Sequence, residues 1–302
     1  MRSGSTRNGS ADSAESPPPE KKSRLDRVLL FRVLSAVVFL PPFVIICLVG
    51  SIPFLLLVLA VALLATREAY RLLSRWNVAP LLPLGTAGVL ALTAIQYRGG
   101  EGEMLLFLVF FFILALLAVL PGRGGHSFAK GAVALFILFY AGWLPSFLVL
   151  LRELPRSPIS SYSYSEGGGF VFLLFLMVWG SDTGAYTVGR IAGRHPLAPS
   201  LSPKKTVEGG VGGLLFAVGG AFAARALWLP SLSAVDALLL GGIAGALSQV
   251  GDLVESKLKR EAEVKDSGSL IPGHGGVLDR FDGIFFAAPF VYYYLRFTAG
   301  GG

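Results

Sequence analysis

Long runs of apolar residues alternate with short polar connections along most of this chain. A run of about 17–25 apolar residues is long enough to cross the hydrocarbon core of a bilayer as a helix. Such runs predict nine spanning helices, near residues 28–50, 53–73, 78–97, 103–120, 129–151, 168–189, 206–229, 234–257 and 282–299. Residues 1–26 lack the pattern, and their Ser, Gly, Pro and Asn content predicts a disordered cytoplasmic tail. We therefore expect an all-α, polytopic integral membrane bundle.

Composition agrees with a membrane protein. The 302 residues are 53% hydrophobic and only 15% charged, whereas soluble domains carry about a quarter charged residues. The single cysteine, Cys47, excludes an internal disulfide. A net charge of +7 suits anionic phosphate ligands or an anionic lipid surface and does not choose between them.

The basic residues predict an orientation. If the N-terminus is cytoplasmic, most of the 26 Lys and Arg residues fall in the tail or in the even-numbered connections. The opposite side keeps only Arg98, Arg152, Arg156, Arg225 and Arg296. This imbalance follows the positive-inside rule and places the C-terminus outside. The connections 190–205 and 258–281 then face the cytoplasm, where nucleotides are found.

Glycines distinguish the C-terminal half. The pairs Gly209/Gly213 and Gly241/Gly245 are spaced so that neighbouring helix backbones can approach closely in lipid. We expect residues 27–151 to form generic membrane helices and residues 152–302 to form the compact, chemically active part.

The connection before the last predicted span is rich in ionisable residues and glycines. It contains Ser256, Lys259-Arg260, Lys265-Asp266, His274-Gly275-Gly276 and Asp279-Arg280-Phe281-Asp282. A plain connector needs only a few polar residues and a turn. Cations, carboxylates and glycines together suit a polyphosphate held with metal ions, because Gly-Gly lets backbone N–H groups reach phosphate oxygens.

The preceding helix carries a polar stripe. At 3.6 residues per turn, Ser248, Asp252, Glu255, Ser256 and Lys259 share one face. A carboxylate within a span is costly unless it faces protein, water or a cation. We expect Asp252 to be a metal ligand, whereas for Glu255 and Ser256 a solvated helix end is an equal alternative. Asp279 starts the adjacent span at the same depth and could share an ion cluster with Asp252.

A second cluster of polar residues precedes this helix in the chain. Ser181-Asp182 lies in an apolar span, and Arg190, Arg194 and Ser202-Pro203-Lys204-Lys205-Thr206 follow. Two lysines at a helix start form a phosphate site. Glu68, within Arg67-Glu68-Ala69-Tyr70-Arg71, is expected to pair with its neighbours.

In residue types and spacing, segment 256–282 resembles the signature of the phosphatidate cytidylyltransferases, also called CDP-diacylglycerol synthases. The Ser181–Tyr186 and Ser202–Gly209 stretches are also similar to that family. The resemblance implies that CTP and phosphatidate give CDP-diacylglycerol and pyrophosphate. It further implies Mg²⁺ on Asp252 and Asp279, with a second cation left open, and a homodimer. The expected location is a bacterial plasma membrane, with the active site facing the cytoplasm, membrane lipid as a partner and no nucleic acid.

The expected site residues form a catalytic set and a substrate-binding set. The catalytic set is Asp252, Lys259, Asp279, Arg280 and Asp282. The substrate-binding set is Ser181, Asp182, Arg190, Ser202, Lys204, Lys205, Ser256, Arg260, Lys265, Asp266, His274, Gly275 and Gly276. His274 is expected to stabilise the loop by hydrogen bonding, because an ionised phosphate nucleophile needs no general base.

Two alternatives remain at this stage. A CTP-dependent polyprenol or phytol kinase would transfer the γ-phosphoryl group to an alcohol, without needing the complete signature. A transporter would also carry aspartates and glycines in its spans, without needing a phosphate-binding loop of this density.

Overall fold

The computed structural model describes residues 37–38, 40–76, 81–99, 101–120, 127–157, 160–268 and 275–299. A helix over Leu40–Val49 comes first. It is followed by α2 (Ser51–Leu73), η1 (Ser74–Trp76), α3 (Leu82–Arg98), α4 (Glu101–Val119), α5 (Ser127–Ile137), the π-helical η2 (Leu138–Trp143), α6 (Leu144–Glu153), η3 (Leu154–Arg156), α7 (Glu166–Ala192), α8 (Val207–Leu227), α9 (Ala234–Glu261) and α10 (Leu278–Ala299). The predicted tail, residues 1–26, and His274 lie outside the described residues.

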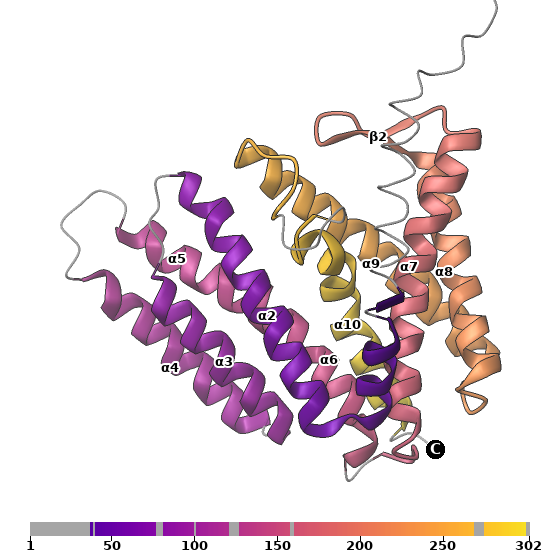
Figure 1. Cartoon of the computed structure of the whole chain (residues 1–302), viewed down its shortest axis with the longest axis horizontal. Helices are drawn as coiled ribbons and strands as arrows, with labels where there is room; N and C mark the ends of the chain where they lie inside the picture. Colours follow the sequence, from indigo (N-terminus) through magenta and orange to yellow (C-terminus); the bar gives the residue numbers. More distant parts are fainter. Residues whose placement is uncertain are drawn as a thin grey trace, which may run out of the picture.

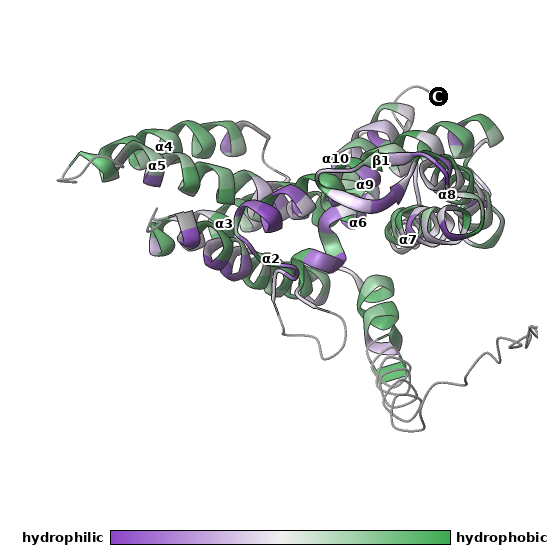
Figure 2. Ribbon diagram, turned by 90° about the horizontal axis from the view of Figure 1, so that it is seen from above, coloured by the Kyte–Doolittle hydropathy of each residue, from purple (hydrophilic) through white to green (hydrophobic). Residues whose placement is uncertain are grey.

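The helical membrane architecture is confirmed. Within the described ranges, six helical stretches are long and apolar enough to cross a membrane. On helix α4, for example, the side chains of Leu105, Leu106 and Phe110 are each more than 60% exposed. A contiguous apolar surface of this kind is unfavourable in water and is suited to contact with lipid. Figure 2 shows such hydrophobic faces on the outside of the bundle. The count of nine spans stays a prediction.

The helices form two groups. Helices α3, α4 and α5 lie together with α2, whereas α7 and α8 lie at the opposite end of the molecule (Figure 1). Helices α6, α9 and α10 lie between them. The largest buried apolar cluster joins residues of α2, α6, α7, α8, α9 and α10, whereas buried residues of α3, α4 and α5 belong to two smaller clusters.

Glycines bring the C-terminal helices into backbone contact, as the sequence predicted. A Cβ built on Gly213 would lie 2.9 Å from the Ser181 carbonyl oxygen of α7. A Cβ on Gly241 would lie 2.5 Å from the Val218 Cα atom of α8. Close approach of this kind adds van der Waals contact, which lipid cannot replace.

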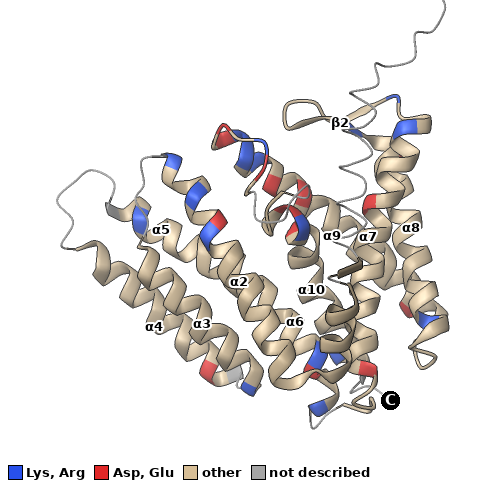
Figure 3. Cartoon of the chain, viewed as in Figure 1, with Lys and Arg blue, Asp and Glu red and all other residues tan. Residues whose placement is uncertain are grey.

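At each of the two ends of the helical bundle, polar contacts join segments that are far apart in the chain. At one end, Arg75 after α2 donates to the Ala262 carbonyl after α9, and Arg260 donates to the Leu201 carbonyl. At the other end, the Ser51 N–H donates to Glu153. Figure 3 shows most of the Lys and Arg residues of the described chain at the first end. The segregation of charge agrees with the positive-inside pattern, while the cytoplasmic assignment stays a prediction.

One buried arginine holds the first helix to the bundle. Arg152 on α6 is fully buried, and its Nε and Nη2 atoms donate to the Cys47 and Leu48 carbonyls at distances of 2.5 and 2.7 Å. A cation on the last carbonyls of a helix satisfies orphan acceptors and complements the helix dipole. The role of Arg152 in the described structure is therefore structural.

A short β-hairpin departs from the all-helical expectation. Strand β1 (Pro196–Ala198) pairs antiparallel with β2 (Ser202–Thr206). The segment with Lys204 and Lys205, which was expected at a helix start, is therefore a strand, and α8 begins at the next residue, Val207. Thr206 caps that helix by accepting from the Gly209 N–H. Glu208 accepts from the Arg194 and His195 N–H groups and thereby ties the hairpin to α8. These tertiary contacts stabilise a two-stranded ribbon that alone is marginal.

Replacing Gly241 by Ala should destabilise the bundle, because its new Cβ would meet the α8 backbone. We expect a loss of about 1–3 kcal/mol in unfolding free energy. The adjacent Gly242 is the matched control, since nothing lies within 4 Å of its built Cβ. Gly242→Ala should be neutral or stabilising by up to about 1 kcal/mol. Thermal unfolding in detergent measures both, and equal effects would contradict this packing.

The orientation predicts opposite labelling of two introduced cysteines in a Cys47→Ser background. In sealed vesicles whose outer face corresponds to the outside of the cell, an impermeant thiol reagent should label Gly302→Cys and not Ser200→Cys. Ser200 is exposed in the hairpin turn, so permeabilised vesicles should label both positions. Protection of Gly302→Cys in sealed vesicles would refute an outside C-terminus.

Candidate active site at the α9–α10 junction

The site begins with close packing of α9 on α10. A Cβ built on Gly251 of α9 would lie 2.5 Å from the Asp282 carbonyl oxygen of α10, so the two backbones touch there. One turn earlier on α9, the Ser248 carbonyl oxygen would lie 3.2 Å from a Cβ built on Gly283 of α10. The polar stripe predicted on α9 consequently meets the charged start of α10.

Three carboxylates gather at this junction. Asp252, Glu255 and Asp282 each offer an oxygen, and these atoms lie within 4.8 Å of one another. Glu255 is only 1% exposed, which excludes a solvated helix end. Its Oε1 atom is buried without a hydrogen-bond partner among the described residues. Three carboxylates this close repel one another, and an unpaired buried oxygen is costly, so the cluster favours a bound cation.

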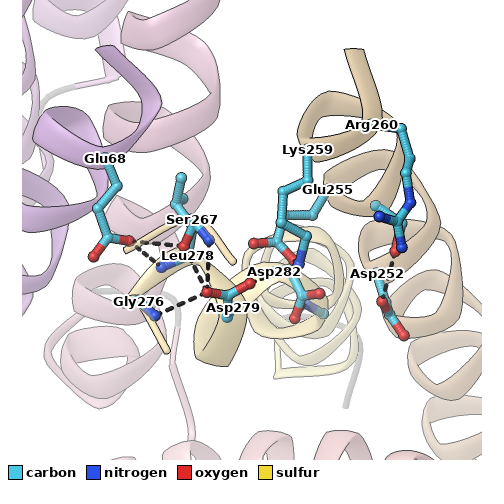
Figure 4. A network of polar contacts seen from close by, with 12 residues as sticks. Glu68, Asp252, Glu255, Lys259, Arg260, Ser267, Gly276, Leu278, Asp279 and Asp282 are labelled. Carbon is cyan, nitrogen blue, oxygen red and sulfur yellow. Dashed lines mark hydrogen bonds and ion pairs between the residues drawn. The ribbon is translucent and has the colours of Figure 1, made fainter. Parts of the chain in front are cut away.

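Two lysines partly neutralise the cluster. The Lys205 ammonium of β2 forms an ion pair with the Asp252 carboxylate. The Lys259 ammonium lies 2.8 Å from Glu255 Oε2 and 2.6 Å from Asp279 Oδ1. Ser256 donates to Asp252 Oδ1 at 3.4 Å. Figure 4 shows Lys259, Glu255 and Asp282 between Asp252 on one side and Asp279 on the other.

Asp279 lies outside the three-carboxylate cluster. Besides Lys259, it accepts from the Ser267 N–H and hydroxyl and from the Gly276 N–H, at distances of 2.8–2.9 Å. Its carboxylate therefore holds the α9–α10 connection together. The prediction that Asp279 binds a metal stays a prediction: its Oδ1 atom accepts from Lys259, and its Oδ2 atom accepts from Ser267 and Gly276.

Glu68 of α2 belongs to this network, contrary to the expectation that it pairs with neighbouring arginines. It is 4% exposed and accepts from the Val277 and Leu278 N–H groups at 3.0 and 2.9 Å. Sequence reasoning missed it because its partners lie about 200 residues away in the chain. The available signal was a carboxylate inside an apolar run, which is expensive without a partner.

A cavity of about 490 Å³ opens on the other side of Asp252. It lies between α7, the hairpin, α8 and α9. Its polar lining includes Asp182, Arg190, Lys204 and Lys205, which were predicted for substrate binding, and Asp252, which was predicted as a metal ligand. Three cations beside two carboxylates are the side-chain types that bind a polyphosphate together with a metal ion. The structure thus unites the two polar sequence groups at Asp252.

Other predicted residues have separate positions. Buried Ser181 donates to the Gly245 carbonyl, and Arg260 binds the hairpin turn through Leu201. Lys265 and Asp266 are exposed on the α9–α10 connection, and Arg280 is exposed at the start of α10. Ser202 lies on β2, outside the cavity lining, and Gly275 and Gly276 lie beside Asp279.

Comparison with known proteins shows the family of this chain. A model described as the cytidylyltransferase family matches residues 30–298. A phosphatidate cytidylyltransferase of Bacillus subtilis is 32% identical over 274 residues, which cover 88% of this chain and 96% of that protein. One of Staphylococcus epidermidis is 34% identical over 266 residues, covering 85% and 95%. One of Synechocystis is 42% identical over 189 residues, covering 56% and 63%.

The match extends over nearly the whole described membrane bundle, and it includes the α9–α10 junction and the cation-lined cavity. The chain belongs to the cytidylyltransferase family.

Proposed function

We propose that this protein transfers CMP from CTP to phosphatidate, giving CDP-diacylglycerol and pyrophosphate. The observation that carries the proposal is the meeting of a cation-lined cavity and a three-carboxylate cluster at Asp252. The full-length relatives named phosphatidate cytidylyltransferase support the choice of substrates.

The triphosphate would bind in the cavity. Arg190, Lys204 and Lys205 supply positive charge at its lining, and Gly209 and Gly210 let the α8 backbone approach a ligand. Arginine and lysine stabilise phosphate oxygens through charge-assisted hydrogen bonds. These residues would hold the departing pyrophosphate and lower the cost of its developing charge.

Mg²⁺ would be held by Asp252, Glu255 and Asp282. All three offer oxygen ligands, which a hard divalent cation prefers, and the unpartnered Glu255 Oε1 would gain a partner. When bound, the cation supplies positive charge that polarises phosphate oxygens. Asp279 would join this set if its Oδ1 atom, which accepts from Lys259, also contacted the cation or released the lysine.

The chain's own task is alignment and neutralisation. An ionised lipid phosphate attacks the α-phosphorus in line without surrendering a proton, so no general base is required. Lys205 already pairs with Asp252, which places an ammonium group at the boundary between the cavity and the carboxylate cluster. It would hold a triphosphate oxygen against the cluster and so orient the α-phosphorus. Lys259 would keep the charge of Glu255 and Asp279 balanced.

The proposal includes the location of the protein and its oligomeric state. The protein would lie in a bacterial plasma membrane with the cavity facing the cytoplasm, where CTP is available. Phosphatidate would reach the site from the bilayer, so that its acyl chains remain in lipid. We also propose a homodimer, which the resemblance of the signature implies.

Labelled CTP distinguishes this reaction from its alternatives. Purified protein given phosphatidate should place label from α-labelled CTP in the lipid extract, and none from γ-labelled CTP. Transfer of γ-label would overturn the proposal in favour of a lipid kinase, and no label in lipid would favour a transporter. An Asp252→Asn variant, which removes a carboxylate oxygen from the cluster, is the negative control.

Magnesium dependence separates the roles of the carboxylates. Asp282→Asn and Glu255→Gln should lower activity by about 10²-fold or more and raise the Mg²⁺ concentration needed for half-maximal rate, because each removes a proposed ligand. Asp279→Asn should lower the rate without moving that concentration, because it loosens the loop and Lys259. Titrating Mg²⁺ against initial rate measures both. A shift for Asp279→Asn alone would instead assign the metal to Asp279.

A further inference from the structure

Glu68 caps the first turn of α10 from a different helix. The first N–H groups of a helix have no partner within it and need an acceptor. The two carboxylate oxygens of Glu68 accept from the Val277 and Leu278 N–H groups, at the start of α10. A side-chain cap usually comes from the residue just before the helix. Here it crosses from α2, and thereby fixes where α10 begins relative to α2.

The same carboxylate reaches Asp279 through one hydroxyl group. The Ser267 oxygen lies 3.1 Å from Glu68 Oε2 and 2.8 Å from Asp279 Oδ2. A serine hydroxyl has a single proton, so it serves one carboxylate at a time. Figure 4 shows Ser267 between the Glu68 and Asp279 side chains. The position of Glu68 is therefore coupled to that of Asp279 and, through it, to Lys259.

The connection fits tightly around Glu68. A Cβ built on Gly268 or Gly276 would lie 2.5 Å from a Glu68 carboxylate oxygen. Any side chain at either glycine would displace the carboxylate. Glu68 therefore touches both described ends of the α9–α10 connection, and it is not among the residues that line the cavity.

We propose that Glu68 is a positioning residue, which holds Ser267 and the start of α10 so that Asp279, Lys259 and Asp282 keep their places beside the cation site. This inference rests on the proposed cytidylyl transfer for its kinetic test alone. It assigns part of the α2 helix, from the half of the chain that lacks signature residues, to the catalytic geometry. The residue acts through the loop and makes no contact with substrate.

Glu68→Gln is the direct test, because it preserves size and replaces one accepting oxygen by an amide donor. We expect kcat at saturating CTP and phosphatidate to fall by about 10–100-fold, since small misplacements of reacting groups cost that much. The KM for CTP should stay within about threefold, because Glu68 does not line the cavity. An unchanged kcat in folded protein would overturn the proposal.

Thr66→Val is the matched control on the same helix. Thr66 is 1% exposed, and its hydroxyl has no hydrogen-bond partner among the described residues. Its replacement should leave kcat unchanged. If Thr66→Val and Glu68→Gln lowered kcat and thermal stability equally, disturbance of α2 would be the cause, and the positioning role would be refuted.

A double-mutant cycle with Ser267→Ala tests the route of coupling. If Glu68 acts through Ser267, adding Glu68→Gln to Ser267→Ala should cost less than adding it to wild type, by about threefold or more. Multiplicative losses would show independent action and would overturn the proposed route.

Limited proteolysis supplies a readout that needs no substrate. Lys265 is exposed in the connection, and Arg194 is exposed in the distant hairpin segment. Trypsin should cut after Lys265 about tenfold faster in Glu68→Gln than in wild type, with no change after Arg194, because the connection opens more readily. Equal cleavage after Lys265 would overturn the proposal whatever reaction the protein catalyses. If Glu68→Gln does not fold, Glu68→Asp should show an intermediate change, and wild-type behaviour of that variant would overturn it.

Discussion

The cost of burying carboxylates governs this structure. The side chains of Glu68, Glu255 and Asp279 are largely shielded from water by the surrounding helices, and an unpaired charge there costs several kcal/mol. Each must therefore be matched by backbone N–H groups, by a lysine or by a cation. Glu68 uses the start of α10, Asp279 uses the α9–α10 connection and Lys259, and Glu255 keeps one oxygen unmatched. That unmatched oxygen is the one that the proposed cation would satisfy.

Helix α9 separates two environments and serves both. Asp252 and Gln249 face the cavity with the hairpin and α7, whereas Glu255 and Lys259 face α10. A regular helix can do this because residues three apart on it differ by about 60° in direction. The cavity and the carboxylate cluster therefore lie on neighbouring faces of one helix, which fixes their spacing. Glycine contacts between α8 and α9, and between α9 and α10, preserve that spacing.

The N-terminal helices also have a part in the site. Arg152 secures the helix before α2, and α2 then carries Glu68 to the start of α10. Contacts between α2 and the α9–α10 connection include the Arg75 hydrogen bond to Ala262. A helix group with lipid-facing surfaces and no recognisable motif thus supports the loop that carries the signature.

The sequence by itself determined the helical membrane class, the approximate helix bounds and the family. Apolar length, charge placement and the 256–282 motif are local properties, so they can be read without coordinates. It also determined that Asp252 lies on a polar stripe and that glycine pairs pack helices. Only the tertiary structure decided that Glu255 is buried beside Asp282, that Asp279 faces the loop, that Ser202–Thr206 is a strand and that Glu68 reaches α10. Those outcomes depend on which helix face meets which neighbour, and partners up to 210 residues apart leave no periodic signal in the chain.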